Sequence, residues 1–202
     1  MKNMTVLKEW LPLTYTKDAI KESRAQNGGK TFLRGIIQRA DTLNQNGRIY
    51  PRAILEREII NYQKFIKENR ALGEIDHPEV SVVELKNVSH IVREARMEND
   101  TVYGVIELLD TPGGKILQSL VESGVTLGIS SRGVGSTRKQ GDSVIVEDDF
   151  QLICFDIVSE PSTPNAFIYL NESKSINSYD LKKTFNKSDR INRIFNDILV
   201  WK

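Results

Sequence analysis

Two separate stretches of the chain hold groups that together could catalyse acyl transfer. Ser130 and Ser131 are adjacent, at the end of an expected strand that enters the Gly-rich segment Arg132–Ser136. A hydroxyl beside exposed backbone N–H groups is what a nucleophile with an oxyanion hole requires. His77 precedes Pro78, which favours an extended backbone, and its neutral imidazole could accept the serine proton. Each signal alone also fits an ordinary loop or a surface histidine, so the hypothesis depends on their combination.

A carboxylate stands where the sequence is otherwise apolar. Asp156 lies in the run Phe150–Val158, and strand alternation would place it on the same face as Leu152 and Cys154. A carboxylate inside such a strand is costly unless it is paired. The sequence therefore predicts a partner for Asp156.

The partner could be the catalytic imidazole. Asp156 would then orient His77 and stabilise its charge, which completes a three-residue relay. Alternatively, Asp156 is an edge residue that accepts hydrogen bonds from loop amides. His90 and Glu74 stay open as alternatives for the third position of the relay.

Other chemistries fit the sequence less well. Gly28–Thr31 resembles the end of a phosphate-binding loop, but Arg24 stands where that motif needs glycine. Arg132 likewise occupies the second glycine position of a G-x-S-x-G nucleophile elbow, which disfavours an α/β-hydrolase. Cys154 is the single cysteine and there are two histidines, so neither a disulfide nor a zinc-ligand spacing is present. We expect no metal and no organic cofactor.

Composition indicates an ordinary globular protein. The 202 residues include 28 Lys and Arg against 27 Asp and Glu, a net charge of +1. This balance gives no reason to expect a nucleic-acid or membrane-surface role. The sequence shows no apolar run of signal-peptide or transmembrane length, so we expect a soluble intracellular protein.

Apolar periodicity and turn residues predict about six strands and two substantial helices. The first helix follows Pro51, and the second runs from Thr111 to Gly124. Strands are expected at 32–39, 88–97, 101–109, 125–131, 143–147 and 150–158. Pro161 and Pro164 are expected to close the folded part, because neither can extend a ladder. The pattern predicts an α+β fold with a largely antiparallel sheet or small barrel.

Four stretches, in order, closely resemble the prohead core proteases of large tailed myophages. They are Asn46–Pro51 (NGRIYP), Ala71–Pro78 (ALGEIDHP), Gly128–Ser136 (GISSRGVGS) and Asp156–Pro164 (DIVSEPSTP). Four matches in the right order make chance a poor explanation. The resemblance spans roughly residues 32–166.

The resemblance implies a fold and a set of roles. The family is similar to the herpesvirus maturational proteases, which implies a small, mostly antiparallel β-barrel flanked by helices. It implies that His77 is the general base, Ser130 the nucleophile and Asp156 the third member. Backbone N–H groups near Arg132 and Gly133 would form the oxyanion hole. Herpesvirus enzymes use a second histidine as third member, so that alternative stays open.

The resemblance also implies substrates and a location. Family members cut scaffold and capsid precursor proteins inside the prohead, which assembles in the host cytoplasm, after Glu in aliphatic-x-Glu sites followed by a small residue. We therefore expect scaffold, core and capsid precursor proteins and further copies of the chain as partners, and neither nucleic acid nor membrane. Leu170–Ser173 is such a site, so we expect self-cleavage after Glu172. Leu120–Ser123 also matches but falls on a predicted helix.

Three parts are expected along the chain: an N-terminal extension (1–30), a serine protease domain (31–172) and a basic C-terminal tail (173–202). The tail carries seven Lys and Arg against three Asp, and its segment Ile191–Leu199 predicts an amphipathic helix. This helix would be a pro-segment, bind scaffold or pack on its own domain. Two alternatives for the whole chain are a non-catalytic capsid-assembly or tail-type structural protein with a protease-like barrel, and a small-molecule esterase.

Overall fold

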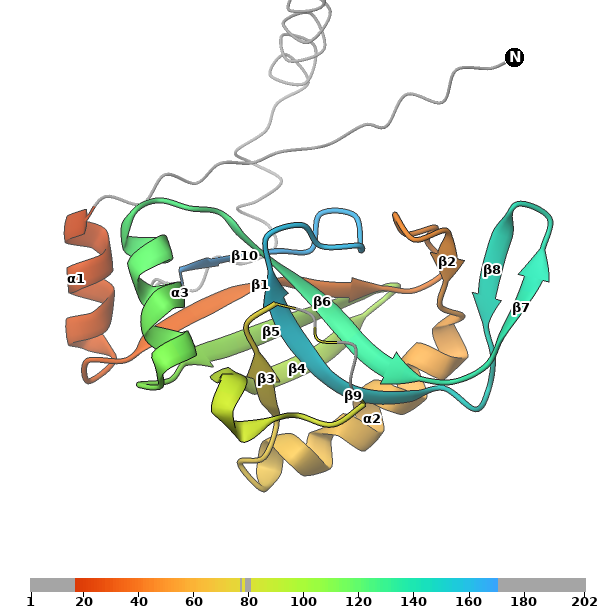
Figure 1. Ribbon diagram of the computed structural model, residues 1–202, viewed down its shortest axis with the longest axis horizontal. Helices are drawn as coiled ribbons and strands as arrows, with labels where there is room; N and C mark the ends of the chain where they lie inside the picture. Colours follow the sequence, from red (N-terminus) through yellow and green to blue (C-terminus); the bar gives the residue numbers. More distant parts are fainter. Residues whose placement is uncertain (1–16, 77, 79–80, 171–202) are drawn as a thin grey trace, which may run out of the picture. The chain divides into compact units, whose positions relative to one another are not determined.

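Ten strands, three α-helices and a short 3-10 helix make up the part of the chain that the computed structural model describes, residues 17–76, 78 and 81–170 (Figure 1). The helices are α1 (Lys17–Gln26), α2 (Arg52–Lys67), the 3-10 helix η1 (Leu85–Asn87) and α3 (Pro112–Glu122). The strands are β1 (Thr31–Arg39), β2 (Arg48–Ile49), β3 (Leu72–Glu74), β4 (Val88–Glu98), β5 (Thr101–Leu108), β6 (Leu127–Val134), β7 (Thr137–Gln140), β8 (Ser143–Val146), β9 (Gln151–Val158) and β10 (Phe167–Leu170). These elements confirm the predicted α+β class.

Seven of the strands form a nearly closed antiparallel barrel in the order β3-β4-β5-β1-β10-β6-β9. Each pair of neighbours in this order is antiparallel. A smaller mixed sheet, β2-β8-β7, lies beside it, with a parallel β2–β8 pair and an antiparallel β8–β7 pair. The predicted small, mostly antiparallel barrel flanked by helices is therefore confirmed.

The expectation that Pro161 and Pro164 close the folded part is wrong. The chain passes both prolines and returns to the barrel as β10, which pairs with β1 on one side and β6 on the other. β9 ends at Val158, before Pro161, and both prolines lie in the connection that leads to β10, where a missing N–H breaks no ladder. Pro161 packs so closely on Gly128 that a Cβ at Gly128 would lie 2.4 Å from its ring.

The barrel closes at a seam between β3 and β9, and its strand number sets the geometry of that seam. An antiparallel series of seven strands leaves its first and last members pointing the same way, so they can meet only in parallel. The structure shows this as a parallel bridge between Ile75 and Ile157. The Asp76 N–H donates to the Ile157 carbonyl at 2.9 Å.

Side chains supply further hydrogen bonds across the seam. The Glu74 N–H donates to the Asp156 carboxylate at 3.1 Å, and His90 Nε2 lies 2.9 Å from the Phe155 carbonyl oxygen. The His90 ring passes over Gly73, where a Cβ would lie 2.1 Å from the Phe155 carbonyl oxygen and 2.3 Å from His90 Nε2. Glycine at position 73 is thus what lets β4 reach across β3 to β9.

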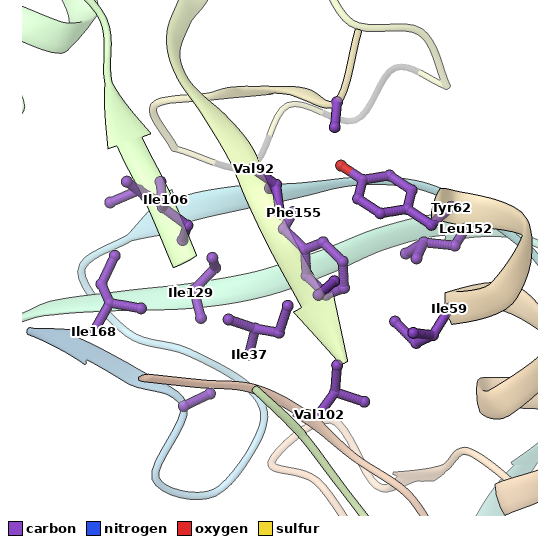
Figure 2. Packing of buried hydrophobic residues seen from close by; sticks show 14 of the residues in the cluster. Ile37, Ile59, Tyr62, Val92, Val102, Ile106, Ile129, Leu152, Phe155 and Ile168 are labelled. Carbon is purple, nitrogen blue, oxygen red and sulfur yellow. The ribbon is translucent and has the colours of Figure 1, made fainter. Parts of the chain in front are cut away.

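The core fills the barrel and continues under α2 (Figure 2). Ile129 of β6 and Phe155 of β9 are fully buried inside it. Tyr62 of α2 packs edge-on against Phe155, with ring centroids 5.5 Å apart and an interplanar angle of 84°. Leu152 also joins this core, contrary to the expectation that it shares a face with Asp156, because the β6–β9 pairing shifts register between Arg132 and Gly133.

Both predicted helices form, α2 beginning one residue after Pro51, which is its N-cap, and α3 for the expected reasons. Thr111 caps α3, since its hydroxyl accepts from the Gly114 N–H at 3.1 Å, and Pro112 is the first helical residue. Gly124 follows α3 with φ 78, the left-handed conformation that glycine adopts most easily.

No helix within the described residues is long and apolar enough to cross a membrane.

The buried imidazole at the seam makes stability depend on pH. Burial lowers the pKa of His90 from 6.5 to about 4, against the opposing influences of the Phe155 carbonyl and Asp156. As pH falls from 6.5 towards 4, the unfolded chain therefore binds a proton at His90 that the folded chain does not. The corresponding contribution to stability is present above pH 6.5 and is lost through this window.

We therefore expect wild type to lose about 2 kcal/mol more stability between about pH 7.5 and about pH 5 than His90→Gln does, because glutamine can donate to the Phe155 carbonyl without titrating. Urea unfolding of both proteins at the two pH values measures the difference. Equal losses in the two proteins would contradict the prediction.

Candidate active site

Ser130 and Asp156 lie directly opposite each other on neighbouring strands. They are register partners in the β6–β9 ladder, so their side chains point to the same face of the sheet as cross-strand neighbours. Both are buried: Ser130 is 7% exposed and Asp156 is 0% exposed. The structure therefore brings together two of the three predicted site residues.

Ser131 faces the other way, because successive strand residues alternate. Its hydroxyl accepts a hydrogen bond from Gln38 Nε2 at 2.6 Å. The Gln38 carbonyl oxygen in turn accepts from Thr163 Oγ1 at 2.5 Å and from the Arg39 N–H at 2.9 Å. Ser131 thus ties β6 to β1, while Ser130 shares a face with the carboxylate.

The Asp156 carboxylate accepts hydrogen bonds from three directions. Arg132 approaches it with two nitrogens of its guanidinium, Nε at 2.8 Å and Nη2 at 3.1 Å. The Glu74 N–H donates from β3 at 3.1 Å, and the Cys154 thiol donates at 3.3 Å. The predicted pairing of Asp156 is confirmed, and Arg132 is a partner that the sequence did not identify.

Arg132 and Glu74 extend this arrangement into a buried ion cluster. Arg132 Nη2 also donates to the Glu74 carboxylate, whose other oxygen accepts from the Glu84 N–H at 3.1 Å. Arg132 Nη1 donates to the Val82 carbonyl at 3.3 Å. Burial disfavours the charge of Arg132, but its hydrogen bonds and ion pairs with Asp156 and Glu74 outweigh burial and raise its pKa. The guanidinium therefore stays charged.

The segment Arg132–Ser136, expected to be a Gly-rich turn, begins as part of a strand. β6 continues to Val134, and its pairing with β9 shifts register between Arg132 and Gly133. Gly133 packs so closely on Phe150 that a Cβ there would lie 2.5 Å from the ring. Close packing against Phe150 therefore requires glycine at position 133.

His77 lies outside the described residues. The residue before it, Asp76, is hydrogen-bonded through its N–H to the carbonyl of Ile157, the residue that follows Asp156. Asp76 has φ 62, a left-handed conformation that aspartate adopts more readily than most residues. Asp76 thus lies at the seam, beside the residue that follows Asp156.

His90 has both ring nitrogens occupied. The carbonyl of Phe155 can only accept, so Nε2 carries the proton and donates to it, and Nδ1 then accepts from the Ser89 hydroxyl at 2.8 Å. This side chain is 0% exposed. The imidazole is a neutral support of the barrel seam.

The Cys154 thiol adds little reactivity to the site. Burial and the nearby Asp156 carboxylate raise the pKa of the Cys154 thiol, which keeps it protonated and poorly nucleophilic. Among the described residues, no group of three or more His, Cys, Asp or Glu is arranged to hold a metal ion.

One signal in the sequence could have identified Arg132. A buried aspartate calls for a cation, and Arg132 is two residues beyond Ser130, which puts both on one face of β6. The missing information was the register that sets Arg132 opposite Cys154 and Ser130 opposite Asp156. Glu74 joins the cluster because β3 meets β9 where the barrel closes, and no local sequence pattern reveals that closure.

Comparison with known proteins defines the class of this barrel and site. The sequence matches the family described as prohead core protein serine protease over residues 9–177. It is 33% identical over 143 residues to the prohead core protein protease of Enterobacteria phage T4, covering 68% of this chain and 67% of that protein. The structure of the bacteriophage T4 capsid assembly protease, gp21, superimposes with a TM-score of 0.62 at 29% identity, covering 64% of this chain and 82% of that one.

These matches define a viral serine protease of capsid assembly. The chain belongs to the family of prohead core protein serine proteases. The matched range, residues 9–177, is wider than the stretch 32–166 that carries the sequence resemblance. Membership in a protease family counts against a non-catalytic assembly protein and against a small-molecule esterase.

Proposed function

We propose that this protein is the endopeptidase that cleaves scaffold, core and capsid precursor proteins within the prohead during maturation. The observation that carries the proposal is the pairing of Ser130 with Asp156 on one face of β6–β9 in a member of this protease family. The name of the T4 relative, a capsid assembly protease, supports prohead proteins as substrates. The family description and the name of the T4 prohead core protein protease support a location inside the prohead, where further copies of the chain would meet.

In the proposed mechanism, Ser130 is the nucleophile and His77 is the general base. The Ser130 oxygen bonds to the scissile carbonyl carbon as its proton passes to His77, and the imidazolium then protonates the departing amine as the C–N bond breaks. Water hydrolyses the acyl-enzyme by the reverse proton route. Backbone N–H groups near Arg132 and Gly133 are the proposed donors to the oxyanion.

Asp156 is the proposed third member of the relay. Its position relative to Ser130 supports it over the alternatives. It is the register partner of Ser130, whereas His90 uses both ring nitrogens at the seam. Glu74 lies on β3, which is separated from the Ser130 strand β6 by β9. The two carboxylates outnumber the one guanidinium of the cluster, and such an excess of negative charge favours a nearby imidazolium.

The two adjacent serines allow a matched test of the nucleophile. A fluorophosphonate probe forms a bond from phosphorus to the attacking serine oxygen and releases fluoride. We expect the probe to label Ser130 in wild type and in Ser131→Ala, and to label neither Ser130→Ala nor His77→Ala, while circular dichroism shows all four proteins folded. Mass-spectrometric mapping of the probe reads the site directly. Labelling of Ser131, or full peptidase activity in Ser130→Ala, would show that Ser130 is not the nucleophile.

We further propose that the protease cleaves its own chain after Glu172. The motif Leu170–Ser173 begins at the last residue of β10, where Leu170 pairs with Leu33. A protease binds its substrate as an extended, accessible segment, so Leu170 has to leave this pairing before cleavage. The similar motif at Leu120–Ser123 overlaps the end of α3, which protects it for the same reason.

Intact-mass measurement over time tests self-cleavage. Wild type should accumulate a fragment that ends at Glu172 and none that ends at Glu122, because helical hydrogen bonds hold the second motif. Glu172→Gln and Ser130→Ala should both stay intact, and Glu122→Gln should be processed like wild type. Absence of the Glu172 fragment from protein that labels with fluorophosphonate would contradict self-cleavage while leaving the nucleophile assignment in place.

A further inference from the structure

The buried ion cluster on the Ser130 face joins four segments that are distant in sequence. Arg132 belongs to β6, Asp156 to β9 and Glu74 to β3, and the fourth segment, Val82–Glu84, is bound through its backbone. Arg132 is two residues from Ser130, and Asp156 lies opposite Ser130. A displacement of any member of the cluster would therefore move residues that surround Ser130, the proposed nucleophile.

Stability alone is a weak reason for burying these charges. Arg132 is 5% exposed, and Glu74 and Asp156 are both 0% exposed. Removing ions from water costs about as much as their mutual attraction returns, so buried ion pairs are often replaceable by apolar side chains without loss of stability. A cluster with two carboxylates and one guanidinium is more readily explained by a demand for fixed geometry.

The contacts show which geometry is fixed. The planar guanidinium meets Asp156 with two nitrogens and reaches Glu74 and the Val82 carbonyl with its remaining edges. The Glu74 carboxylate meanwhile holds the Glu84 N–H. The chain between residues 74 and 84 is thus fastened at both of its ends to the sheet face that carries Ser130.

We propose that Arg132 and Glu74 are positioning residues of the protease, which hold Asp156 and the segment Val82–Glu84 in the arrangement that makes Ser130 reactive. The inference rests on the proposed role of Ser130 as nucleophile. Neither residue contacts substrate in this account. They act through the carboxylate opposite the nucleophile and through the two ends of the chain between residues 74 and 84.

Glu58 offers a matched control for a purely structural carboxylate. It is buried on α2, accepts from the Leu152 N–H of β9 at 2.8 Å and pairs with Arg57 at 2.9 Å. Its strand partner lies four residues before Asp156, outside the ion cluster. Glu58→Gln and Glu74→Gln therefore remove the same charge from comparable buried sites that both support β9.

The test is the kinetics of Ser130 labelling by fluorophosphonate, separated into kinact and KI, with Tm measured for each protein. Glu74→Gln and Arg132→Lys should each lower kinact about tenfold or more, because small misplacements of reacting groups cost this much, and should leave KI within about twofold. Glu58→Gln should leave kinact within about twofold of wild type at a comparable loss of Tm. Arg132→Lys keeps the positive charge but loses the planar group that donates two parallel hydrogen bonds to Asp156. This variant tests the positioning role on its own if Glu74→Gln does not fold.

Two results would overturn the proposal, and they are distinguishable. If Glu74→Gln and Arg132→Lys label at Ser130 as fast as Glu58→Gln does, the cluster is structural and the nucleophile assignment stands. If wild type is labelled at another residue, the proposed function fails and the positioning role fails with it.

Discussion

Both the closure of the barrel and the arrangement of the candidate site depend on the contacts of the Asp156 carboxylate. It faces Ser130 from the neighbouring strand, accepts the Glu74 N–H across the seam and receives the Arg132 guanidinium. An antiparallel barrel with seven strands must close on a parallel pair, and that pair is short here. The Asp156 side chain adds a hydrogen bond where the backbone ladder between β3 and β9 is short, and it does so on the sheet face that carries Ser130.

This placement links stability to chemistry. The seam contacts of His90 and Asp76 lie on the two sides of Asp156 along β9, at Phe155 and Ile157. Each fixes the strand that presents the carboxylate. The same strand packs Phe155 into the core beneath Tyr62, so β9 is held by the core on one face and by ions on the other. A protease that must keep a nucleophile rigid gains from such two-sided support.

The parts of this arrangement that depend on local pattern can be predicted from the sequence. The cap at Thr111 and the capped end at Gly124 followed from residue type, and the need of Asp156 for a partner followed from its apolar neighbours. The parts that local sequence pattern does not predict depend on strand register and sheet topology. Pro161 and Pro164 indicate a break in strand structure but not that the chain re-enters the barrel after them as β10. The position of Leu152 depends on the register shift opposite Gly133, which has no local signature. The role of Arg132 as ion partner emerges only when Ser130 is set opposite Asp156.

Amide hydrogen exchange at the seam tests the central claim most directly. The account predicts that Asp156→Ala removes protection from the Glu74 and Asp76 amides while the amides of the β1–β5 ladder stay protected, because the carboxylate holds the seam and the rest of the barrel has its own ladders. Unchanged protection at residues 74 and 76 in Asp156→Ala would show that the barrel closes without this carboxylate, and would contradict the account.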